Sequence, residues 1–459
     1  MKERIHKFYL NGVYIVLDVN SGAVHIVDKI VYDIVDDYYD LSAEELERKY
    51  DYSIKDIKEA REEIEVLVKE DLLFTEPITI DLVPFKNQNI IKALCLHMAH
   101  DCNLKCEYCF ASQGNFKGER ALMDLETGKR ALEFLCENSG NRVNLEVDFF
   151  GGEPLMNFEV IKELVKYGRE LEPKYNKHFR FTCTTNGVLL SGEVMDFLNE
   201  NMDNVVLSLD GRRSVNDKMR KTLTDKGSYD IITPKFQEFV KKRGDKDYYI
   251  RGTFTNQNLD FSKDIMDYYK LGFKKVSMEP VVTDPNEYYA LRSEHLDDIL
   301  REYEELSKEY IDIKKNDNEF MFFHFMIDLN QGPCIIKRAS GCGAGNEYLA
   351  VTPKGELYPC HQFVGEEEFI MGNVWDGITR PDIREAFKNT NVFTKDECSS
   401  CWARFYCSGG CHANAWYQNH DINKTYKMGC EMERKRIECA ISILANQEEA
   451  PDETTSDAN

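Results

Sequence analysis

Three cysteines lie close together in the first third of the chain, at Cys102, Cys106 and Cys109, in a C-x3-C-x2-C pattern. They follow an apolar strand-like run, Ala93–Met98, and are therefore expected in a loop. Three thiolates on a short loop can hold three irons of a cubane cluster and leave the fourth iron without a protein ligand. Sites that activate a bound molecule keep such an open position. Zinc is the alternative metal, but it suits three cysteines without a fourth nearby ligand poorly.

A second set of polar residues and glycines stands at the ends of later strand-like runs. Glycines let the backbone approach a ligand closely, and a glutamate matches a cationic amine. Parallel sheets bind ligands at the carboxyl ends of their strands, so these residues are expected to gather in one place. Asn186-Gly187 and Asp210-Gly211 are also ordinary turn pairs. The candidates are Gly151, Gly152, Glu153, Thr185, Asn186, Ser208, Asp210 and Arg220.

A second cysteine group follows much later in the chain. Fifteen cysteines in all are more than a cytosolic protein needs for packing, and in a reducing compartment metal ligation or redox chemistry explains them better than disulfides. A zinc ribbon formed by Cys398, Cys401, Cys407 and Cys411 alone is an alternative. The group consists of Cys342, Cys360, Cys398, Cys401, Cys407, Cys411 and Cys430, with Cys334 just before it. Isolated cysteines are expected to be buried small hydrophobes, namely Cys95, Cys136, Cys183 and Cys439.

The elements that must position the first group alternate between strand and helix over residues 92–310. This alternation predicts a parallel sheet or barrel, and periodicity does not distinguish the open form from the closed one. The predicted strands are Leu145–Phe150, Phe179–Thr184, Val205–Leu209, Ile250–Thr255 and Lys275–Glu279, with helices such as Leu125–Cys136, Glu159–Glu170 and Glu193–Asn199 between them. From about residue 334 onward, loops rich in cysteine and glycine are expected, as where metal replaces a hydrophobic core.

The first 90 residues are predicted to form a separate module. A hairpin around Asn11-Gly12 and a third strand, Ala23–Val27, are followed by three helical stretches. The helices are predicted over Lys29–Tyr39, after the N-cap residue Ser42, and over Ser53–Glu70. This order is winged-helix-like.

Composition excludes several classes of protein. The net charge of −23 argues against a nucleic-acid partner, which requires a basic surface. No apolar run is long enough to span a membrane, and the N-terminus has no signal-peptide core. We therefore expect a cytoplasmic protein without a membrane partner. The last residues, from Gln447, carry five acids and no base and are expected to form a disordered tail.

The first cysteine loop resembles the signature of the radical S-adenosylmethionine superfamily, in which an aromatic residue, here Tyr108, precedes the last cysteine. The resemblance implies a partial (β/α)6 barrel and a 4Fe-4S cluster on the three cysteines. It implies that Gly151, Gly152 and Glu153 bind the methionine amino group of S-adenosylmethionine. It also implies ribose and carboxylate contacts from the other candidates, Thr185, Asn186, Ser208, Asp210 and Arg220.

The second cysteine group resembles the SPASM extension, which carries two auxiliary 4Fe-4S clusters, so three clusters are expected in all. The resemblance implies an outer cluster on Cys398, Cys401, Cys407 and Cys430, and an inner cluster on Cys342, Cys360 and Cys411. Either Cys334 or a substrate thiolate would complete the inner cluster. A thiolate on an open iron would be deprotonated and held beside the radical. The nearby histidines, His361 and His412, are expected to pack against neighbours.

The N-terminal module resembles the element that recognises leader peptides of ribosomally made, modified peptides. Such elements bind the leader as an added strand, here between the strand Val24–Asp28 and the helix that starts at Ser53. The whole combination resembles the maturases of cysteine-rich SCIFF peptides, which form a thioether between a Cys sulfur and a side-chain carbon, commonly of Thr. A 5′-deoxyadenosyl radical would abstract hydrogen from the peptide, and flavodoxin or ferredoxin would supply electrons.

Two other functions remain open. The first is that the chain matures sulfatases, as related SPASM enzymes do, or oxidises another peptide, although the extra N-terminal module argues against a sulfatase substrate. A non-catalytic electron-transfer protein with several clusters is the second, against which the Gly151–Pro154 turn and the open cysteine site argue. The expected α/β domains are a leader-recognition domain over 1–90, a radical core over 91–310, a loop-rich SPASM domain over 311–445 and the tail over 446–459.

Overall fold

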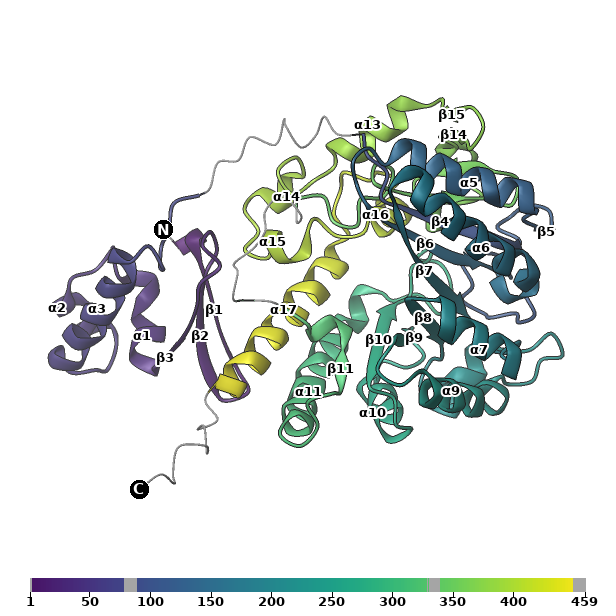
Figure 1. Cartoon of the computed structure of the whole chain (residues 1–459). Helices are drawn as coiled ribbons and strands as arrows, with labels where there is room; N and C mark the ends of the chain where they lie inside the picture. The colour runs from purple at the N-terminus through teal and green to yellow at the C-terminus, as the bar shows by residue number, and fades with distance from the viewer. Residues whose placement is uncertain (1, 78–88, 328, 330–338, 449–459) are drawn as a thin grey trace, which may run out of the picture.

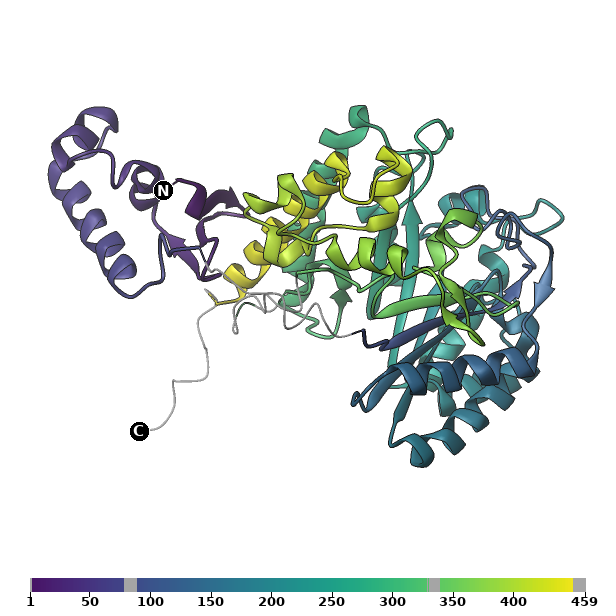
Figure 2. The same ribbon diagram turned by 90° about the horizontal axis from the view of Figure 1, so that it is seen from above.

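The computed structural model describes residues 2–77, 89–327, 329 and 339–448. In that part, a large α/β body carries a small N-terminal domain at one side, and a long C-terminal helix runs between the two (Figures 1 and 2). Among these residues, no helix has both the length and the apolar character needed to cross a bilayer.

The body is built on six parallel strands that pair in the order in which they occur along the chain. They are β4 (Ala93–His100), β6 (Asn144–Gly151), β7 (His178–Thr185), β8 (Asn204–Ser208), β9 (Asp247–Phe254) and β10 (Lys275–Pro280). Because each strand lies beside the next, the chain winds in one direction, as in a barrel. Strand β12 (Tyr348–Val351) continues the sheet beyond β4, and β11 (Met321–Phe322) continues it beyond β10. The sheet therefore stays open, which gives the expected partial (β/α)6 barrel.

Helices connect these strands and cover the outer face of the sheet (Figure 1). They are α5 (Leu125–Asn138), α6 (Phe158–Tyr175), α7 (Gly192–Asn201), α8 (Arg213–Met219), α9 (Tyr229–Arg243), α10 (Ser262–Lys270) and α11 (Leu296–Lys314). Apolar residues recur along α6 at helical spacing, and Ile161, Leu164 and Leu171 are buried against the sheet. The predicted strands and helices are thus confirmed, with ends that differ by a few residues.

The strands of the body alternate in character between their two faces. In β6, Leu145, Val147 and Phe149 are fully or almost fully buried beneath the helices. Asp148 and Phe150 point to the opposite face and are half-buried. This period of two leaves a polar interior on the concave side of the barrel, where a substrate can enter.

The N-terminal domain has the predicted order of strands and helices. Its antiparallel sheet runs β1-β2-β3, and the helices follow. Ser42 caps α2 with a reciprocal capping box, and Ser53 caps α3. The elements are β1 (Ile5–Leu10), β2 (Val13–Asp18), β3 (Val24–Val27), α1 (Lys29–Ile34), α2 (Ala43–Lys49) and α3 (Ile54–Lys69).

Both faces of this small sheet are covered. Ile5 and Val16 pack with the domain's own helices, whereas Phe8, Ile15 and Leu17 join the core of the body. The body contributes helix α17 (Lys427–Glu448), which contacts both β1 and β2. The N-terminal domain is therefore anchored on the body by the apolar face of its sheet.

The C-terminal region contains more regular structure than the sequence predicted. Helix α17 has 22 residues and extends three residues past the boundary expected at 445. It packs against α11, β1, β2 and other elements, so apolar residues occur around several of its sides and no single amphipathic stripe marks it. The other elements of the region are β13 (Glu356–Tyr358), β14 (Gly372–Asn373), β15 (Gly377–Ile378), α13 (Pro381–Asn389), α14 (Asp396–Ser399), α15 (Arg404–Cys407) and α16 (His412–Asn419).

Short elements complete the fold. They are β5 (Ala121–Leu122) and the 3-10 turns η1 (Lys2–Arg4), η2 (Val35–Asp37), η3 (Pro154–Asn157), η4 (Ser293–His295), η5 (Phe323–Phe325), η6 (His361–Phe363) and η7 (Glu367–Phe369).

Candidate active site

The first cysteine loop follows β4 and opens onto a cavity at the carboxyl ends of the strands. The cavity has a volume of about 130 Å³. Most of the residues predicted for this site line it, although they come from five separate stretches of chain. They are Cys102, Cys106, Tyr108, Cys109, Gly151, Gly152, Thr185, Asn186, Ser208 and Arg220. The other two predicted residues, Glu153 and Asp210, do not line the cavity and are fully buried.

Backbone pairing with the segment after β8 holds the cysteine loop in place. The N–H of Lys105 donates to the carbonyl of Lys221, and the N–H of Glu107 donates to the carbonyl of Met219, both at 2.8 Å. The loop residues between Cys102 and Cys109 are thus bound to the residues on either side of Arg220. Two segments more than a hundred residues apart in the sequence form one wall of the site.

Tyr108, Asp210 and Arg220 form a buried polar cluster beneath that wall. The Tyr108 hydroxyl donates to Oδ2 of Asp210 at 2.6 Å, and Nη1 of Arg220 donates to the same hydroxyl oxygen at 2.8 Å. Burial raises the pKa of Asp210, while Arg220 and the Tyr108 hydrogen bond oppose the shift. Asp210 therefore influences a ligand in the cavity indirectly, through its contacts with Tyr108 and Arg220. Nε of Arg220 is buried and has no protein partner in the described part of the chain, so it can donate to a bound ligand.

Glu153 is held by three donors at the end of β6. Its carboxylate accepts from the Thr185 hydroxyl at 2.7 Å, from the N–H of Asn186 at 2.8 Å and from the N–H of Leu155 at 3.1 Å. Burial raises the pKa of Glu153 to about 7, and these hydrogen bonds act in the opposite direction. A cationic ligand beside this carboxyl would stabilise its charged form.

The two glycines of the Gly151–Pro154 turn are required by neighbouring backbone. A Cβ added to Gly151 would lie 2.4 Å from the carbonyl oxygen of Ala99, and one added to Gly152 would lie 2.2 Å from that of Asp101. The N–H of Gly152 already donates to Ala99. These glycines, expected to allow close approach to a ligand, also let the end of β6 approach the start of the cysteine loop.

The thiols of the loop are suited to iron-bound thiolates. Burial raises the pKa of Cys102 and that of Cys106 to about 12, so they remain neutral until a metal displaces their protons. Two N–H donors already point at Sγ of Cys102, from the side chain of Asn186 at 3.6 Å and from the backbone of Leu104 at 3.4 Å. Such donors stabilise a thiolate, so the residues present fit a cluster.

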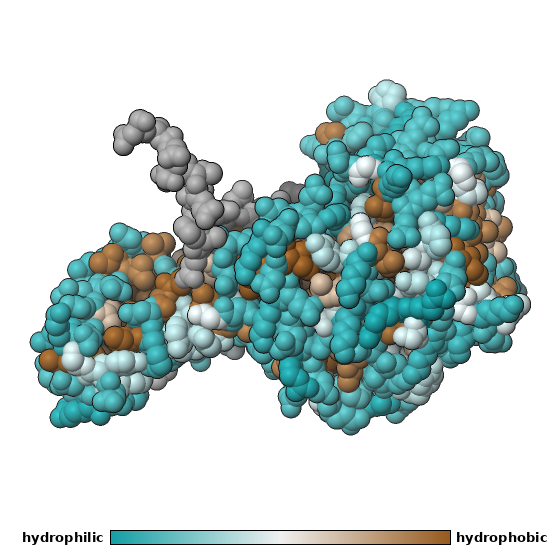
Figure 3. All heavy atoms as spheres, turned by 90° about the horizontal axis from the view of Figure 1, so that it is seen from below, coloured by the Kyte–Doolittle hydropathy of each residue, from teal (hydrophilic) through white to brown (hydrophobic). Residues whose placement is uncertain are grey.

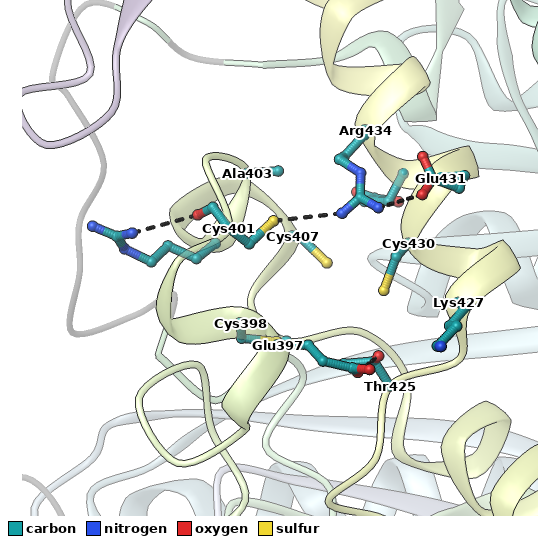
Figure 4. A pocket seen from close by; sticks show the side chains of 13 residues that line it. Glu397, Cys398, Cys401, Ala403, Cys407, Thr425, Lys427, Cys430, Glu431 and Arg434 are labelled. Carbon is teal, nitrogen blue, oxygen red and sulfur yellow. Dashed lines mark hydrogen bonds and ion pairs between the residues drawn. The ribbon is translucent and has the colours of Figure 1, made fainter. Parts of the chain in front are cut away.

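The four cysteines predicted for the outer cluster line a single cavity of about 240 Å³. Figure 4 shows Cys398, Cys401, Cys407 and Cys430 around it, supplied by the α14–α15 region and by α17. Nη1 of Arg434 lies 3.8 Å from Sγ of Cys401. Within the described ranges, no three His, Cys, Asp or Glu side chains are close enough to hold a single metal ion. The cysteines instead surround a volume that a larger group can fill.

The three cysteines predicted for the inner cluster lie near one another. Cys342 and Cys411 both interact electrostatically with Cys360, whose pKa is raised mainly by burial. Cys360 is buried, whereas Cys342 and Cys411 are exposed. Cys334, the alternative fourth ligand, lies outside the described residues, so the choice between it and a substrate thiolate stays a prediction.

The neighbouring histidines pack against aromatic side chains. Nδ1 of His361 lies 3.1 Å from the Tyr348 hydroxyl, and its ring centroid is 5.0 Å from that of Phe150. The ring centroid of His412 is 5.3 Å from that of Phe387.

Sequence reasoning missed the polar residues of the barrel interior. Burial raises the pKa of Asp148 to about 7. Nε of Arg251 lies 3.9 Å from Oε1 of Glu279, and Nε2 of His324 lies 3.3 Å from the same oxygen. Polar residues at alternate positions of otherwise apolar strands were the signal that could have identified them.

Comparisons with known proteins agree with this arrangement. Residues 93–232 match the family described as a 4Fe-4S single cluster domain, and residues 342–402 match SPASM, described as an iron–sulfur cluster-binding domain. The cysteine-type anaerobic sulfatase-maturating enzyme of Clostridium perfringens (strain 13 / Type A) is 24% identical over 366 residues, which cover 75% of this chain and 95% of that protein.

Two solved structures share the fold. The structure of anSMEcpe with bound AdoMet superposes with a TM-score of 0.66 at 21% identity and covers 78% of this chain and 95% of its own. Streptococcus suis SuiB bound to precursor peptide SuiA gives a TM-score of 0.52 at 17% identity and covers 92% of this chain and 97% of its own. Together with the cysteine loop, the open barrel and the second cysteine group, these findings identify the chain as an enzyme of the radical S-adenosylmethionine type with a SPASM domain.

Proposed function

We propose that this enzyme matures a ribosomally made, cysteine-rich precursor peptide by forming a thioether between a Cys sulfur and a side-chain carbon, commonly of Thr. The observation that carries the proposal is the combination of an open cysteine loop, a second cysteine group and an N-terminal sheet whose strand β3 has a free edge, meaning that no strand among the described residues pairs with its outer side. The reaction removes two hydrogens from the peptide, one from the carbon and one from the thiol.

The bound cofactors supply the difficult chemistry, and the chain supplies their positions. With S-adenosylmethionine bound, a cluster held by Cys102, Cys106 and Cys109 would supply the radical chemistry that removes hydrogen from the peptide, and a cluster held by Cys342, Cys360 and Cys411 would bind the substrate thiol and accept the surplus electron. Glu153 is the candidate acceptor for the methionine ammonium group. Ser208 and Arg220 line the same cavity and are candidate contacts for the ribose and the carboxylate. Flavodoxin or ferredoxin is the proposed electron donor.

The breadth of the structural match favours a peptide substrate with a leader. The SuiB structure, which contains a precursor peptide, covers 92% of this chain, whereas anSMEcpe covers 78%. The additional coverage is consistent with a peptide-modifying enzyme that has a domain like the N-terminal one. The anSMEcpe structure has also been solved with bound peptide, Kp18Cys.

The free edge of β3 is the proposed site for the leader. The N–H of Asp18 donates to the carbonyl of Ala23, and hydrogen-bonded pairs alternate along an antiparallel ladder. His25 and Val27 therefore direct their backbone groups toward β2, while Val24 and Ile26 direct theirs outward. These outward groups can pair with an added strand.

Exposed hydrophobic side chains occur on the same domain. Ile26 on β3, Val66 on α3 and Leu72 after α3 are all exposed hydrophobic side chains. Figure 3 shows apolar residues gathered on the N-terminal domain, at the left of the view. A leader with apolar side chains at alternate positions would cover such a surface.

The mass of the product tests the proposal. Reconstituted enzyme is incubated anaerobically with S-adenosylmethionine, a reductant and the cysteine-rich peptide encoded next to its gene. We expect a product lighter by two hydrogens, with one thiol fewer available for alkylation. A variant with Cys102, Cys106 and Cys109 all changed to Ala should leave the peptide unmodified. Cleavage of S-adenosylmethionine with no change in the peptide would contradict the assigned substrate.

The sulfatase-maturing alternative is tested in the same assay with a sulfatase-derived peptide. Its oxidation in preference to the cysteine-rich peptide would favour that function. Absence of 5′-deoxyadenosine from reduced enzyme would instead favour an electron-transfer protein.

A further inference from the structure

Lys395 occupies a buried position between the two auxiliary cysteine groups. It directly precedes α14, and its side chain is only 3% exposed. Its Nζ donates to the carbonyl oxygen of Gly409 at 2.9 Å. Gly409 lines the outer cavity and belongs to the short link between Cys407 and Cys411. The ammonium group therefore lies against the segment that joins the outer group to the inner one.

The charge of Lys395 lacks a carboxylate partner in the part of the chain that the structure describes. The groups that act electrostatically on it are four thiols, those of Cys398, Cys407, Cys430 and Cys411. Burial lowers the pKa of Lys395, and these thiols act in the opposite direction. A buried ammonium is costly unless an anion compensates it. Three of the thiols belong to the outer set and one to the inner set, so thiolates bound to iron would provide that compensation from both sides.

We propose that Lys395 is a positioning residue that bridges the inner and outer auxiliary clusters electrostatically and stabilises the reduced form of each. The inference rests on the proposed assignment of the two clusters. Each cluster gains one negative charge when it takes up an electron. A fixed, desolvated cation favours that more negative state, because Coulomb energies are larger away from water. Lys395 would thereby make both bound clusters easier to reduce.

The chain offers a matched control at the same cavity. Lys427 also lines the outer cavity, but its side chain is exposed. Figure 4 shows Lys427 at the N-terminal end of α17, on the side of Cys430. Changing Lys427 to Met removes the same charge as changing Lys395 to Met. Because solvent screens an exposed charge, the Lys427 change should have a much smaller effect.

The test is a redox titration followed by electron paramagnetic resonance. It uses the variant in which Cys102, Cys106 and Cys109 are Ala, so that only the auxiliary clusters contribute signals. The iron content of the parent variant is measured first, because the absence of auxiliary clusters from it would contradict the proposed function itself. With the clusters present, Lys395→Met should lower both midpoint potentials, Lys395→Arg should keep them close to those of the parent, and Lys427→Met should shift them less.

Every other outcome is decisive as well. Unchanged potentials in Lys395→Met, a shift no larger than that of Lys427→Met, or a shift in only one of the two clusters would overturn the bridging role. Loss of auxiliary iron in Lys395→Met but not in Lys395→Arg would support it, since the charge would then be needed to hold the clusters. Loss in both variants would overturn it, because packing of the side chain would then be what the site requires.

Discussion

The phenol of Tyr108 donates a hydrogen bond of 2.6 Å to Oδ2 of Asp210. This contact joins the cysteine loop to the end of β8, and Arg220 donates to the same phenol oxygen. A side chain between two cluster cysteines thus depends on a buried acid about a hundred residues later in the chain.

Tyr108→Phe should weaken the cysteine loop. The change leaves the buried Asp210 without its phenol donor, and loss of a buried hydrogen bond to a charged group costs about 2 kcal/mol. We expect a lower free energy of unfolding and faster loss of iron from the first cluster, measured by denaturation and by iron release to a chelator. Tyr288→Phe is the control, because its hydroxyl bonds Glu107 of the same loop while the side chain is 54% exposed. Equal effects of the two changes would count against the role of Tyr108.

Gly152→Ala should disrupt the first cluster more severely than a change at any exposed glycine. The new Cβ would lie 2.2 Å from the carbonyl oxygen of Asp101, next to Cys102, so the loop must move. We expect at least a tenfold decrease in 5′-deoxyadenosine formation, with auxiliary iron retained. The control is Gly192→Ala at the start of α7, where no atom lies within 4 Å of the added Cβ. Normal cleavage of S-adenosylmethionine by Gly152→Ala would contradict this account of the turn.

Asp148 should make stability fall as the pH rises. Burial raises its pKa to about 7, above the value of about 4 of an unfolded Asp. The folded state therefore binds more protons than the unfolded state between about pH 4 and pH 7, and its stability decreases across that range. Asp148→Asn should unfold at a higher temperature than the parent at pH 8, with a smaller difference at pH 5. A difference between the two proteins that does not vary with pH would refute this assignment.

Ile26→Pro should weaken leader binding without unfolding the domain. The N–H of Ile26 points away from β2, so proline removes a donor from the free edge and none from the ladder. We expect at least a tenfold higher Kd for the leader peptide, measured by fluorescence anisotropy. Tyr9→Pro makes the same change at the opposite edge, on β1, and should leave the Kd close to that of the parent. Equal losses of affinity in both variants would show that the leader does not pair with β3.

Much of the fold was predictable because local patterns and tertiary structure agree. In strands β6 and β7, buried apolar residues alternate with more exposed ones. The Asn11-Gly12 pair forms the turn of the first hairpin. Helix α17 was not predicted because it contacts α11 on one side and β1 and β2 on another. A helix buried on several sides carries no amphipathic stripe.

The candidate site was predictable as a set of residues but not as a geometry. Spacing and resemblance identified Cys398, Cys401, Cys407 and Cys430, which the structure places around one cavity. The bond between Tyr108 and Asp210, and the place of Lys395, depend on segments brought together only by the folded barrel and the C-terminal loops. Long-range contacts of this kind leave no periodic signal in a single sequence.

The central claim is that the radical formed at the Cys102 loop removes hydrogen from a carbon of the peptide. The most direct test uses a precursor peptide deuterated at all its carbon-bound positions, incubated with enzyme, S-adenosylmethionine and reductant. We predict that 5′-deoxyadenosine acquires one deuterium for each thioether formed, as measured by mass spectrometry. Formation of the thioether with no deuterium in 5′-deoxyadenosine would contradict the account.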